Sequence, residues 1–520
     1  YKYLCNKYII KHMSRVKKVI KNAKIGVFFY IISILVQFFS RKIFLDYLGD
    51  DFIGLSTTLN SILGFLNLTE LGIGTAIGFT LYKPIFDDNN NEINKIFTFF
   101  GYIYRKVGIA IIILGIIISC FFPLIFNDVN FDLGLIYFMF FSFMISSLLG
   151  YFFNFHLFLL EADQKGYIVT SYFQFFSLTR VIFQSIISIY FESYILWVLL
   201  EVVFSIINTI ALRKRIKKEY PWLIINSNSN KEILKDYPEL IKTIKQVFAH
   251  KLGGFVLSST DQILIFAFVN LQSVAFFGNY QLIFAKLLGL LNNFFAGTSA
   301  GIGNLVAENN PNSIKKIFWE MMALRFFIAG ILTVCLYYLM DSFITLWLGE
   351  KYILGNSILL LMLANLFMSQ IRIPIDNFKQ AYGLFADTWA PIAEVILNLG
   401  ISIVFGKIWG IAGIMLGTFV SISLIVLIWK PYYVYKKGFN ISVLFYWKGS
   451  IKLIIAFIAS IMIIDFLIID HITMVISNFW DWILFAIKIS TITIFLYGLL
   501  LFTISVGFRD FLNRIRLLIK

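Results

Sequence analysis

Long apolar segments recur along nearly the whole chain and are separated by short polar stretches. Each apolar segment covers about 20 residues, enough for one helix across the hydrocarbon core of a bilayer. The strict alternation of a membrane β-barrel is absent, so the backbone groups must be satisfied within helices. We therefore predict an all-α polytopic membrane protein with about 14 transmembrane helices. The predicted spans cover residues 25–45, 54–82, 99–122, 133–160, 167–190, 194–212, 246–269, 275–306, 318–340, 357–378, 388–406, 409–429, 451–469 and 484–506.

The second predicted span carries a band of small and polar residues on one helical face. Steps of three and four place these residues together along a helix. A helix that faces only lipid gains nothing from such a band, so we expect this one to line a cavity. Its carboxylate, Glu70, either accepts a hydrogen bond from a neighbouring helix or belongs to a gate or ion pathway. The band consists of Asn60, Gly64, Asn67, Glu70, Gly74 and Gly78.

Two weak sequence similarities indicate an internal repeat. The segment from Gly54 to Gly78 has a counterpart from Gly278 to Gly303, and residues 163–167 have a counterpart at 382–388. Six spans per repeat is an even number, so the two halves share their orientation in the membrane. We predict two pseudo-symmetric six-helix lobes around a central cavity, followed by two C-terminal helices. The predicted regions are a basic N-terminal segment (1–24), an N-lobe (25–212), a connector (213–245), a C-lobe (246–430), and the last two spans with a basic tail (431–520).

Composition and charge support the membrane assignment and orient the chain. Hydrophobic residues make up 59% of the sequence, charged residues 14%, and the mean hydropathy is +0.83. With the N-terminus inside, 36 of the 44 lysines and arginines lie in predicted inside segments, two lie in outside loops and six lie within spans. Positive residues concentrate on the cytoplasmic side of membrane proteins. We expect both termini and the connector to be cytoplasmic, and the net charge of +15 to reflect topology rather than nucleic-acid binding.

The cysteines and histidines are scattered without the spacing of a metal site or a disulfide framework, and no phosphate-binding loop is evident. We expect no cofactor. Because the chain begins with Tyr1, we also expect a short segment to precede it.

Several motifs occur in an order that resembles a known family, the polysaccharide flippases of the multidrug/oligosaccharidyl-lipid/polysaccharide (MOP) exporter superfamily. The resemblance runs from about residue 25 to 450 and includes Tyr47-Leu-Gly-Asp-Asp-Phe-Ile-Gly, Thr69-Glu-Leu-Gly-Ile-Gly-Thr-Ala, Glu161-Ala-Asp-Gln-Lys-Gly-Tyr, Ser259-Thr-Asp-Gln-Ile-Leu-Ile, Trp347-Leu-Gly-Glu-Lys-Tyr and Gly410-Ile-Ala-Gly-Ile-Met-Leu-Gly-Thr. It implies a transporter in a bacterial plasma membrane that moves polyprenyl-diphosphate-linked oligosaccharide to the outer leaflet for surface polysaccharide synthesis. Its expected partners are a polymerase and glycosyltransferases of the same pathway.

Polar stripes on otherwise apolar spans predict the residues that meet such a substrate. The fifth span carries Gln174, Ser177, Arg180, Gln184 and Ser188, and similar stripes occur in the first, eighth and eleventh spans. Cations within the membrane suit a diphosphate, and arginine can bind phosphate with two parallel hydrogen bonds. The candidate substrate-binding residues are Arg41, Arg180, Gln184, Lys286, Asn293 and Arg325. The candidates for ion coupling or a gate are Glu70, Asp261 and Glu394.

Each of these charged residues could instead have a purely structural role. Arg180 and Glu201 differ by only about 5 Å in depth at 1.5 Å of rise per residue, so they could form a permanent ion pair. Lys286 and Asp261 could pair in the same way. Arg325 could extend toward the headgroups rather than into a cavity.

Three other functions remain open from the sequence. A polysaccharide polymerase or glycosyltransferase needs a substantial outward domain with catalytic groups, and the predicted outward loops are short. A multidrug exporter needs a cavity dominated by carboxylates. In the predicted spans of this chain, the arginines and lysines that could line a cavity are at least as numerous as the acidic residues. A peptidoglycan-precursor flippase differs only in its sugar.

Overall fold

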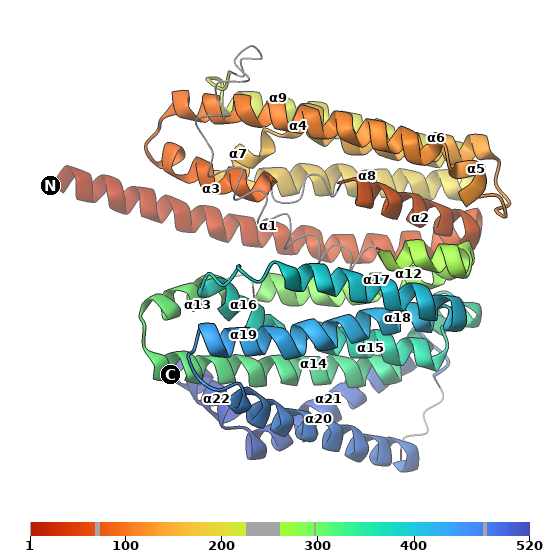
Figure 1. The fold of residues 1–520 in the computed structure, drawn as a ribbon. Helices are drawn as coiled ribbons and strands as arrows, with labels where there is room; N and C mark the ends of the chain where they lie inside the picture. Colours follow the sequence, from red (N-terminus) through yellow and green to blue (C-terminus); the bar gives the residue numbers. More distant parts are fainter. Residues whose placement is uncertain (1, 68–72, 225–259, 296–297, 472–475, 520) are drawn as a thin grey trace. The chain divides into compact units, whose positions relative to one another are not determined.

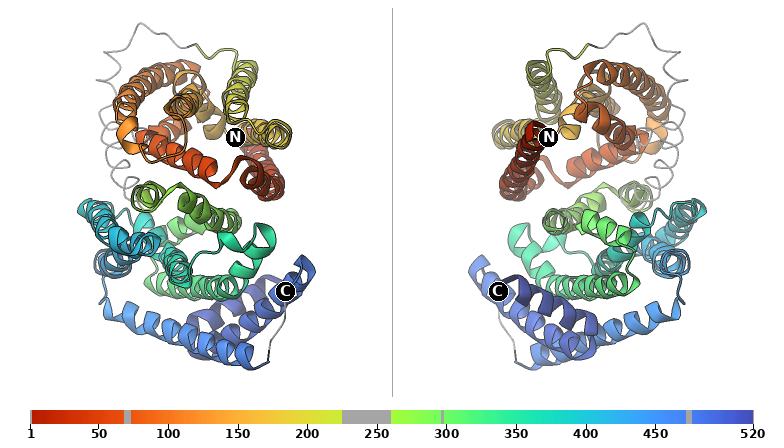
Figure 2. Two further views of the ribbon diagram at one scale, coloured as in Figure 1. Left: turned by 90° about the vertical axis from the view of Figure 1, so that its right-hand side faces the viewer. Right: turned by 90° about the vertical axis from the view of Figure 1, so that its left-hand side faces the viewer.

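The computed structural model describes residues 2–67, 73–224, 260–295, 298–471 and 476–519. These residues form helices joined by short turns, and no strand occurs among them (Figure 1). The chain divides into two compact units, Tyr1–Ala275 and Phe276–Lys520. Seen along the helix axes, each unit is a bundle of roughly parallel helices (Figure 2). The all-helical fold predicted from the apolar segments is confirmed.

The first unit contains the following helices in chain order. They are α1 (Lys2–Leu48), α2 (Asp50–Leu66), α3 (Ile73–Phe86), α4 (Asn90–Ser119), α5 (Phe122–Ile125), α6 (Leu133–Leu149), the π-helix η2 (Gly150–Asn154), α7 (Leu157–Ala162), α8 (Gly166–Phe191) and α9 (Tyr194–Glu219).

The second unit begins within α12 and contains the remaining helices. They are α12 (Leu271–Phe294), α13 (Thr298–Ala307), α14 (Pro311–Trp347), η3 (Glu350–Tyr352), α15 (Asn356–Ile371), α16 (Ile373–Ala381), α17 (Trp389–Trp409), α18 (Ile411–Ser421), the π-helix η4 (Ile422–Trp429), α19 (Lys430–Lys437), α20 (Leu444–His471), α21 (Phe479–Ile504) and α22 (Val506–Ile519).

Eleven helices of the described residues are long and apolar enough to cross a membrane. The other three of the fourteen predicted spans are not among these eleven helices. The span at 54–82 corresponds to α2 and α3, whose connection lies outside the described residues, and most of the span at 246–269 also lies outside them. The span at 167–190 is α8, a 26-residue helix that its polar stripe makes less apolar than the others. The chain is a multi-pass membrane protein.

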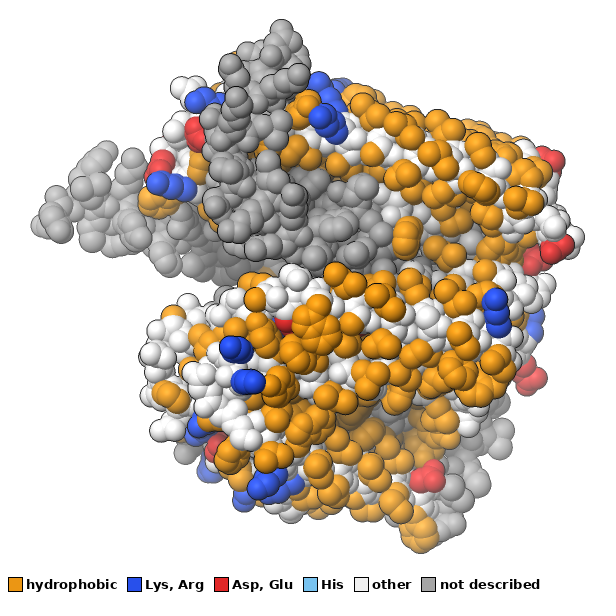
Figure 3. All heavy atoms as spheres, viewed as in Figure 1, with side chains coloured by type: hydrophobic (Ala, Val, Ile, Leu, Met, Phe, Trp, Pro, Cys, Tyr) orange, Lys and Arg blue, Asp and Glu red, His pale blue; other side chains and the backbone are white. Residues whose placement is uncertain are grey.

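Hydrophobic side chains cover the flanks of the helices, and charged ones lie mainly near the helix ends (Figure 3). A soluble protein would bury most of these large apolar side chains. Phe39, Phe294 and Phe495 are instead 71%, 82% and 68% exposed. This surface fits a lipid environment.

Backbone conformation confirms the internal repeat. Three non-regular positions in the first unit have a positive φ, and each has a counterpart with a positive φ in the second unit 218 to 221 residues later. The pairs are Asp88 (φ 52°) with Asn309 (53°), Gln164 (60°) with Gly383 (65°), and Glu192 (46°) with Gly410 (57°). They end α3 and α13, α7 and α16, and α8 and α17. The two chain segments therefore turn at corresponding places.

The helix starts after the first of these turns are also equivalent. Asn89 caps α4 by accepting a hydrogen bond from the backbone of Glu92, and Asn310 caps α14 by accepting hydrogen bonds from Asn312 and Ser313. A side-chain acceptor at this position satisfies backbone N–H groups that have no partner within the helix.

The last three helices pack directly on α14. A Cβ atom on Gly330 of α14 would lie 2.3 Å from the ring of Tyr497 in α21, and one on Gly449 of α20 would lie 2.0 Å from the ring of Trp319 in α14. Both glycines therefore make room for an aromatic ring. Phe318 and Phe326 of α14 lie in the main hydrophobic core of this unit together with Tyr497.

Candidate functional site: polar seams and a buried charge cluster

The candidate residues Arg180 and Gln184 both lie at the interface between α8 and α9, which we call a seam because polar side chains join the two helices along it. Arg180 donates a hydrogen bond from Nη1 to Oε1 of Glu201, and their side chains are 22% and 20% exposed. One turn further along α8, buried Gln184 donates from Nε2 to the backbone oxygen of Trp197 at 3.0 Å. The ion pair considered from the sequence is thus present. Nε of Arg180 is buried without a hydrogen-bond partner among the described residues, so the guanidinium has unused donor capacity.

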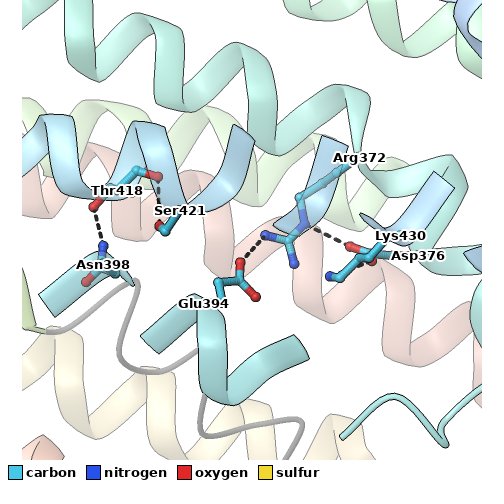
Figure 4. Close-up of polar contacts among 7 residues, drawn as sticks. All are labelled: Arg372, Asp376, Glu394, Asn398, Thr418, Ser421 and Lys430. Atoms are coloured by element: carbon cyan, nitrogen blue, oxygen red, sulfur yellow. Dashed lines mark hydrogen bonds and ion pairs between the residues drawn. The ribbon is translucent and has the colours of Figure 1, made fainter. Parts of the chain in front are cut away.

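The second unit has an equivalent seam between α17 and α18. Asn398 and Ser402 lie 218 residues after Arg180 and Gln184. Asn398 donates from Nδ2 to Oγ1 of Thr418 at 2.9 Å, and Ser402 donates from Oγ to the backbone oxygen of Ile414 at 3.0 Å (Figure 4 shows the Asn398–Thr418 bond). The buried members of both polar stripes therefore hold neighbouring helices together. The second seam does this without a charge.

Glu394 of α17 lies in a partly buried cluster with charges from two other elements (Figure 4). Its Oε1 is 4.0 Å from Nη1 of Arg372, at the junction of α15 and α16, and it makes no hydrogen bond with a described residue. Arg372 Nε is 2.8 Å from Asp376 Oδ2, and Lys430 Nζ is 2.9 Å from Asp376 Oδ1. The cluster thus contains two cations and two carboxylates. Glu394, whose side chain is 4% exposed, is the member with spare acceptor capacity.

A second ion pair lies close to this cluster in sequence. Lys379 Nζ is 2.6 Å from Oδ1 of Asp387, and Trp429 donates from Nε1 to Oδ2 of the same aspartate at 3.1 Å. The sequence interpretation missed Arg372, Asp376, Lys379 and Lys430, because counting charges by loop assigned them to inside loops. The spacing of Arg372 and Asp376, four residues apart, was the available signal for a pair.

Arg325 of α14 is buried rather than extended toward solvent. Its side chain donates from Nη1 to Oε1 of Gln370 at 3.1 Å and lies over the ring of Phe295, 4.3 Å from the centroid. The residue is 4% exposed. A buried guanidinium held by an amide and an aromatic ring keeps its positive charge without a carboxylate among these contacts.

Asp261 is a buried carboxylate of the first unit. It is 5% exposed, and its Oδ1 has no hydrogen-bond partner among the described residues. The next residue, Gln262, accepts a hydrogen bond from Ser61 of α2 at 2.5 Å. Asp261 therefore lies on a helix that is hydrogen-bonded to α2, and it forms no ion pair with another residue in the part of the chain that the structure describes.

The other candidates are dispersed. Arg41 donates from Nη2 to the backbone oxygen of Ala275 at 3.0 Å. Lys286 is half-buried and Asn293 is exposed, and both belong to the second unit, whereas Asp261 belongs to the first. Glu70 lies outside the described residues. The structure thus brings the candidates to several helix seams rather than to one place within either unit.

One cavity of about 910 Å³ lies in the first unit, where α3, α7 and α9 end. Asp163 and Glu219 line it, and Lys165 bridges them at 2.9 and 3.1 Å. Burial alone would lower the pKa of Lys165, but hydrogen bonds and charges from both carboxylates outweigh burial and raise the pKa. Tyr220 donates to Asp163 at 2.9 Å, and burial together with that negative charge raises the pKa of Tyr220. The turns that form this end were all predicted to be on the same side of the membrane.

Comparisons with known proteins identify the fold. No protein-family model matches the chain, and no curated protein matches it. Among solved structures, it is similar to the lipid II flippase MurJ in an inward closed conformation, with 15% identity, 92% of this chain and 98% of that chain covered, and a TM-score of 0.66.

It is also similar to multidrug resistance MATE family transporters of the MOP superfamily. The inward-facing one has 13% identity, covers 80% of this chain and 99% of its own, and gives a TM-score of 0.53. The outward-facing one has 12% identity, covers 81% and 96%, and gives 0.50. These neighbours are transporters and flippases rather than enzymes. The chain therefore has the fold shared by a lipid flippase and multidrug transporters of the MOP superfamily.

Proposed function

We propose that the protein is a flippase that moves polyprenyl-diphosphate-linked oligosaccharide from the cytoplasmic to the outer leaflet of a bacterial plasma membrane. The observation that carries the proposal is the similarity to a lipid II flippase over almost the full length of both chains. That neighbour moves a lipid, and its coverage of this chain exceeds that of the multidrug transporters. The motif resemblance in the sequence adds the class of polysaccharide flippases.

The charge of Arg180 supports an anionic substrate. The equivalent seam in the second unit closes with the neutral Asn398–Thr418 pair, so the position does not need a charge to join its two helices. A partly buried ion pair gives little net stability, because the desolvation of both ions offsets their attraction. The positive charge of Arg180 therefore fits a second role, and we assign it to contact with the diphosphate of the substrate. The Nε of Arg180, which has no hydrogen-bond partner among the described residues, is available for that contact.

The remaining proposed substrate contacts are Arg41, Gln184, Lys286, Asn293 and Arg325. Arg325 is the strongest of them, because its guanidinium is buried and contacts Gln370 and Phe295 but no carboxylate of the described residues. We place the two lobes, 25–212 and 246–430, on either side of the substrate path, with both termini in the cytoplasm.

Transport is proposed to be coupled to a proton or sodium gradient through Asp261 or Glu394. Both are buried carboxylates with an oxygen that has no hydrogen-bond partner among the described residues. Proton or cation binding that differs between inward- and outward-open states would drive alternating access. Flipping by reconstituted protein should slow when the gradient is collapsed, and Asp261→Asn or Glu394→Gln should remove that dependence. Unchanged flipping without a gradient, together with wild-type behaviour of both variants, would exclude coupling through these acids.

A depletion experiment separates this function from its alternatives. In cells that lack the protein, lipid-linked oligosaccharide should accumulate on the inner leaflet, where an external glycosidase does not reach it until the membrane is opened. Loss of a polymerase would leave the accumulated units accessible from outside. Loss of a multidrug exporter would cause no accumulation and would increase sensitivity to organic cations. Loss of a peptidoglycan-precursor flippase would stop cell growth and would not specifically stop surface polysaccharide synthesis. Any of these three results contradicts the proposal.

A further inference from the structure

The C-terminal helix α22 begins directly where a membrane-spanning helix ends. Only Ser505 separates it from α21, and the Ser505 side chain accepts a hydrogen bond from the backbone N–H of Phe508 at 3.2 Å. A one-residue connection leaves α22 no distance to move away from the bilayer. The helix therefore begins where the membrane-spanning helix α21 ends.

One face of α22 is fixed to α14 by three contacts. A Cβ atom on Gly507 would lie 2.4 Å from the backbone oxygen of Trp319, so only glycine permits this approach. Phe508 is buried in the hydrophobic core. Arg514 donates from Nε and Nη2 to the two carboxylate oxygens of Glu320 at 2.8 and 3.1 Å, and the Glu320 side chain is 5% exposed. These contacts determine which residues of α22 face away from the protein.

The opposite face carries arginines among large apolar residues. Val506 and Leu517 are 63% and 74% exposed, Leu512 is 37% exposed, and Arg509 and Arg516 are exposed beside them. Neither arginine forms an ion pair with another of the described residues of this unit. Steps of three and seven place Val506, Arg509 and Arg516 along one side of the helix. Helices that lie in the headgroup region of membranes carry lysines or arginines on a polar face and large apolar side chains beside it, and on α22 the exposed apolar residues lie on either side of the two arginines.

We propose that α22 is an anionic-lipid binding site, in which Arg509 and Arg516 bind lipid phosphates and Val506, Leu512 and Leu517 enter the acyl boundary. Charge complementarity selects the lipid, because a net negative headgroup attracts juxtamembrane arginines and a zwitterionic one does not. The fixed opposite face holds the two arginines at headgroup depth. The inference depends neither on the proposed substrate nor on which side of the membrane the C-terminus occupies.

The test measures lipid binding to folded full-length protein. Purified protein in detergent, selected as a single species by size exclusion, is titrated with phosphatidylglycerol or phosphatidylcholine, and bound lipid is counted by native mass spectrometry. The wild type should prefer phosphatidylglycerol. Two basic residues at a membrane surface together contribute roughly tenfold or more in affinity. The double variant Arg509→Gln/Arg516→Gln should lose about that factor for phosphatidylglycerol and nothing for phosphatidylcholine.

A matched variant controls for the general loss of charge. Lys437→Gln/Lys448→Gln removes two exposed positive charges from α19 and α20 and should leave phosphatidylglycerol binding unchanged. Leu512→Ser/Leu517→Ser should weaken the binding of both lipids. The proposal is overturned if the wild type shows no preference for phosphatidylglycerol, if the arginine variant binds it like the wild type, or if the lysine control loses as much. Should the glutamine variant fail to fold, Arg509→Lys/Arg516→Lys must still prefer phosphatidylglycerol, or the proposal fails.

Discussion

Arg180 and Asn398 occupy equivalent positions in the two units and show why a side chain's contact does not define its role. Each bonds to the next helix, Arg180 to Glu201 and Asn398 to Thr418. The neutral pair shows that hydrogen bonding is sufficient to close such a seam. Joining the two helices therefore does not explain why residue 180 is charged.

Mutating the pair separates the structural and transport roles of Arg180. Arg180→Ala should lower stability by roughly 1–3 kcal/mol, because the partly buried Glu201 is left without its partner. Adding Glu201→Ala should restore most of the stability, whereas export of the lipid-linked oligosaccharide should remain lost. Protein abundance, thermal melting and surface polysaccharide in the three strains provide the measurement. Recovery of export in the double variant would mean that Arg180 serves only as the partner of Glu201.

Lys165 provides a prediction with a defined pH range. The pKa of Lys165 is raised in the folded protein, so its bridge contributes fully below the ordinary lysine pKa of 10.5 and is lost as pH rises through the higher folded value. Lys165→Met should therefore lower the melting temperature at pH 8, and the difference from wild type should shrink above pH 10.5. Lys437→Met, at an exposed position, is the control and should show no such trend. A pH-independent difference at Lys165 would indicate lost packing instead of a lost ion pair.

At the scale of elements, the α17–α18 hairpin depends on close backbone contact. A Cβ atom on Gly413 would lie 1.9 Å from the backbone oxygen of Phe405, and one on Gly417 would lie 2.1 Å from Oγ of Ser402. Small residues allow membrane helices to approach in this way and let side chains such as Ser402 reach the neighbouring backbone.

Two alanine substitutions in this hairpin should have opposite effects. Gly413→Ala should destabilise the protein by roughly 1–3 kcal/mol, because the methyl group forces the helices apart. Gly400→Ala, in α17 of the same hairpin, has no atom within 4 Å of the new methyl group and should be neutral or stabilising by up to about 1 kcal/mol. Thermal melting in one detergent measures both. Equal destabilisation by the two variants would contradict the close contact.

The sequence predicted helices well and side-chain partners poorly. Apolar segments of membrane length specify helices directly, and the small difference in depth between Arg180 and Glu201 on adjacent helices made their ion pair one of the two alternatives. The cluster of Glu394 with Arg372, Asp376 and Lys430 could not be predicted, because it joins three elements that are distant in sequence. Tertiary packing brings Arg372 and Asp376 to Glu394 and Lys430, and a charge count by loop does not contain that information.

At the scale of the whole molecule, orientation rests on the distribution of basic residues. With 36 of the 44 lysines and arginines in predicted inside segments and two in outside loops, both termini and the connector should be cytoplasmic. A cysteine at position 228, in a background without Cys5, Cys120 and Cys335, should react with an impermeant maleimide only after the membrane is opened. Cysteines at positions 351 and 407 should react in intact cells. Labelling of position 228 from outside would show that the predicted orientation of the chain in the membrane is wrong.

Lipid flipping by purified protein tests the central claim most directly. Protein is reconstituted into vesicles that carry polyprenyl-diphosphate-linked oligosaccharide in both leaflets, and a membrane-impermeant glycosidase then reports the share that reaches the outer surface. The account predicts that wild-type protein makes nearly the whole pool accessible, that Arg180→Ala/Glu201→Ala protein, although folded, leaves it at the outer-leaflet share, and that empty vesicles do the same. If wild-type vesicles match empty ones while accumulating an organic cation, the protein is not a flippase of this lipid.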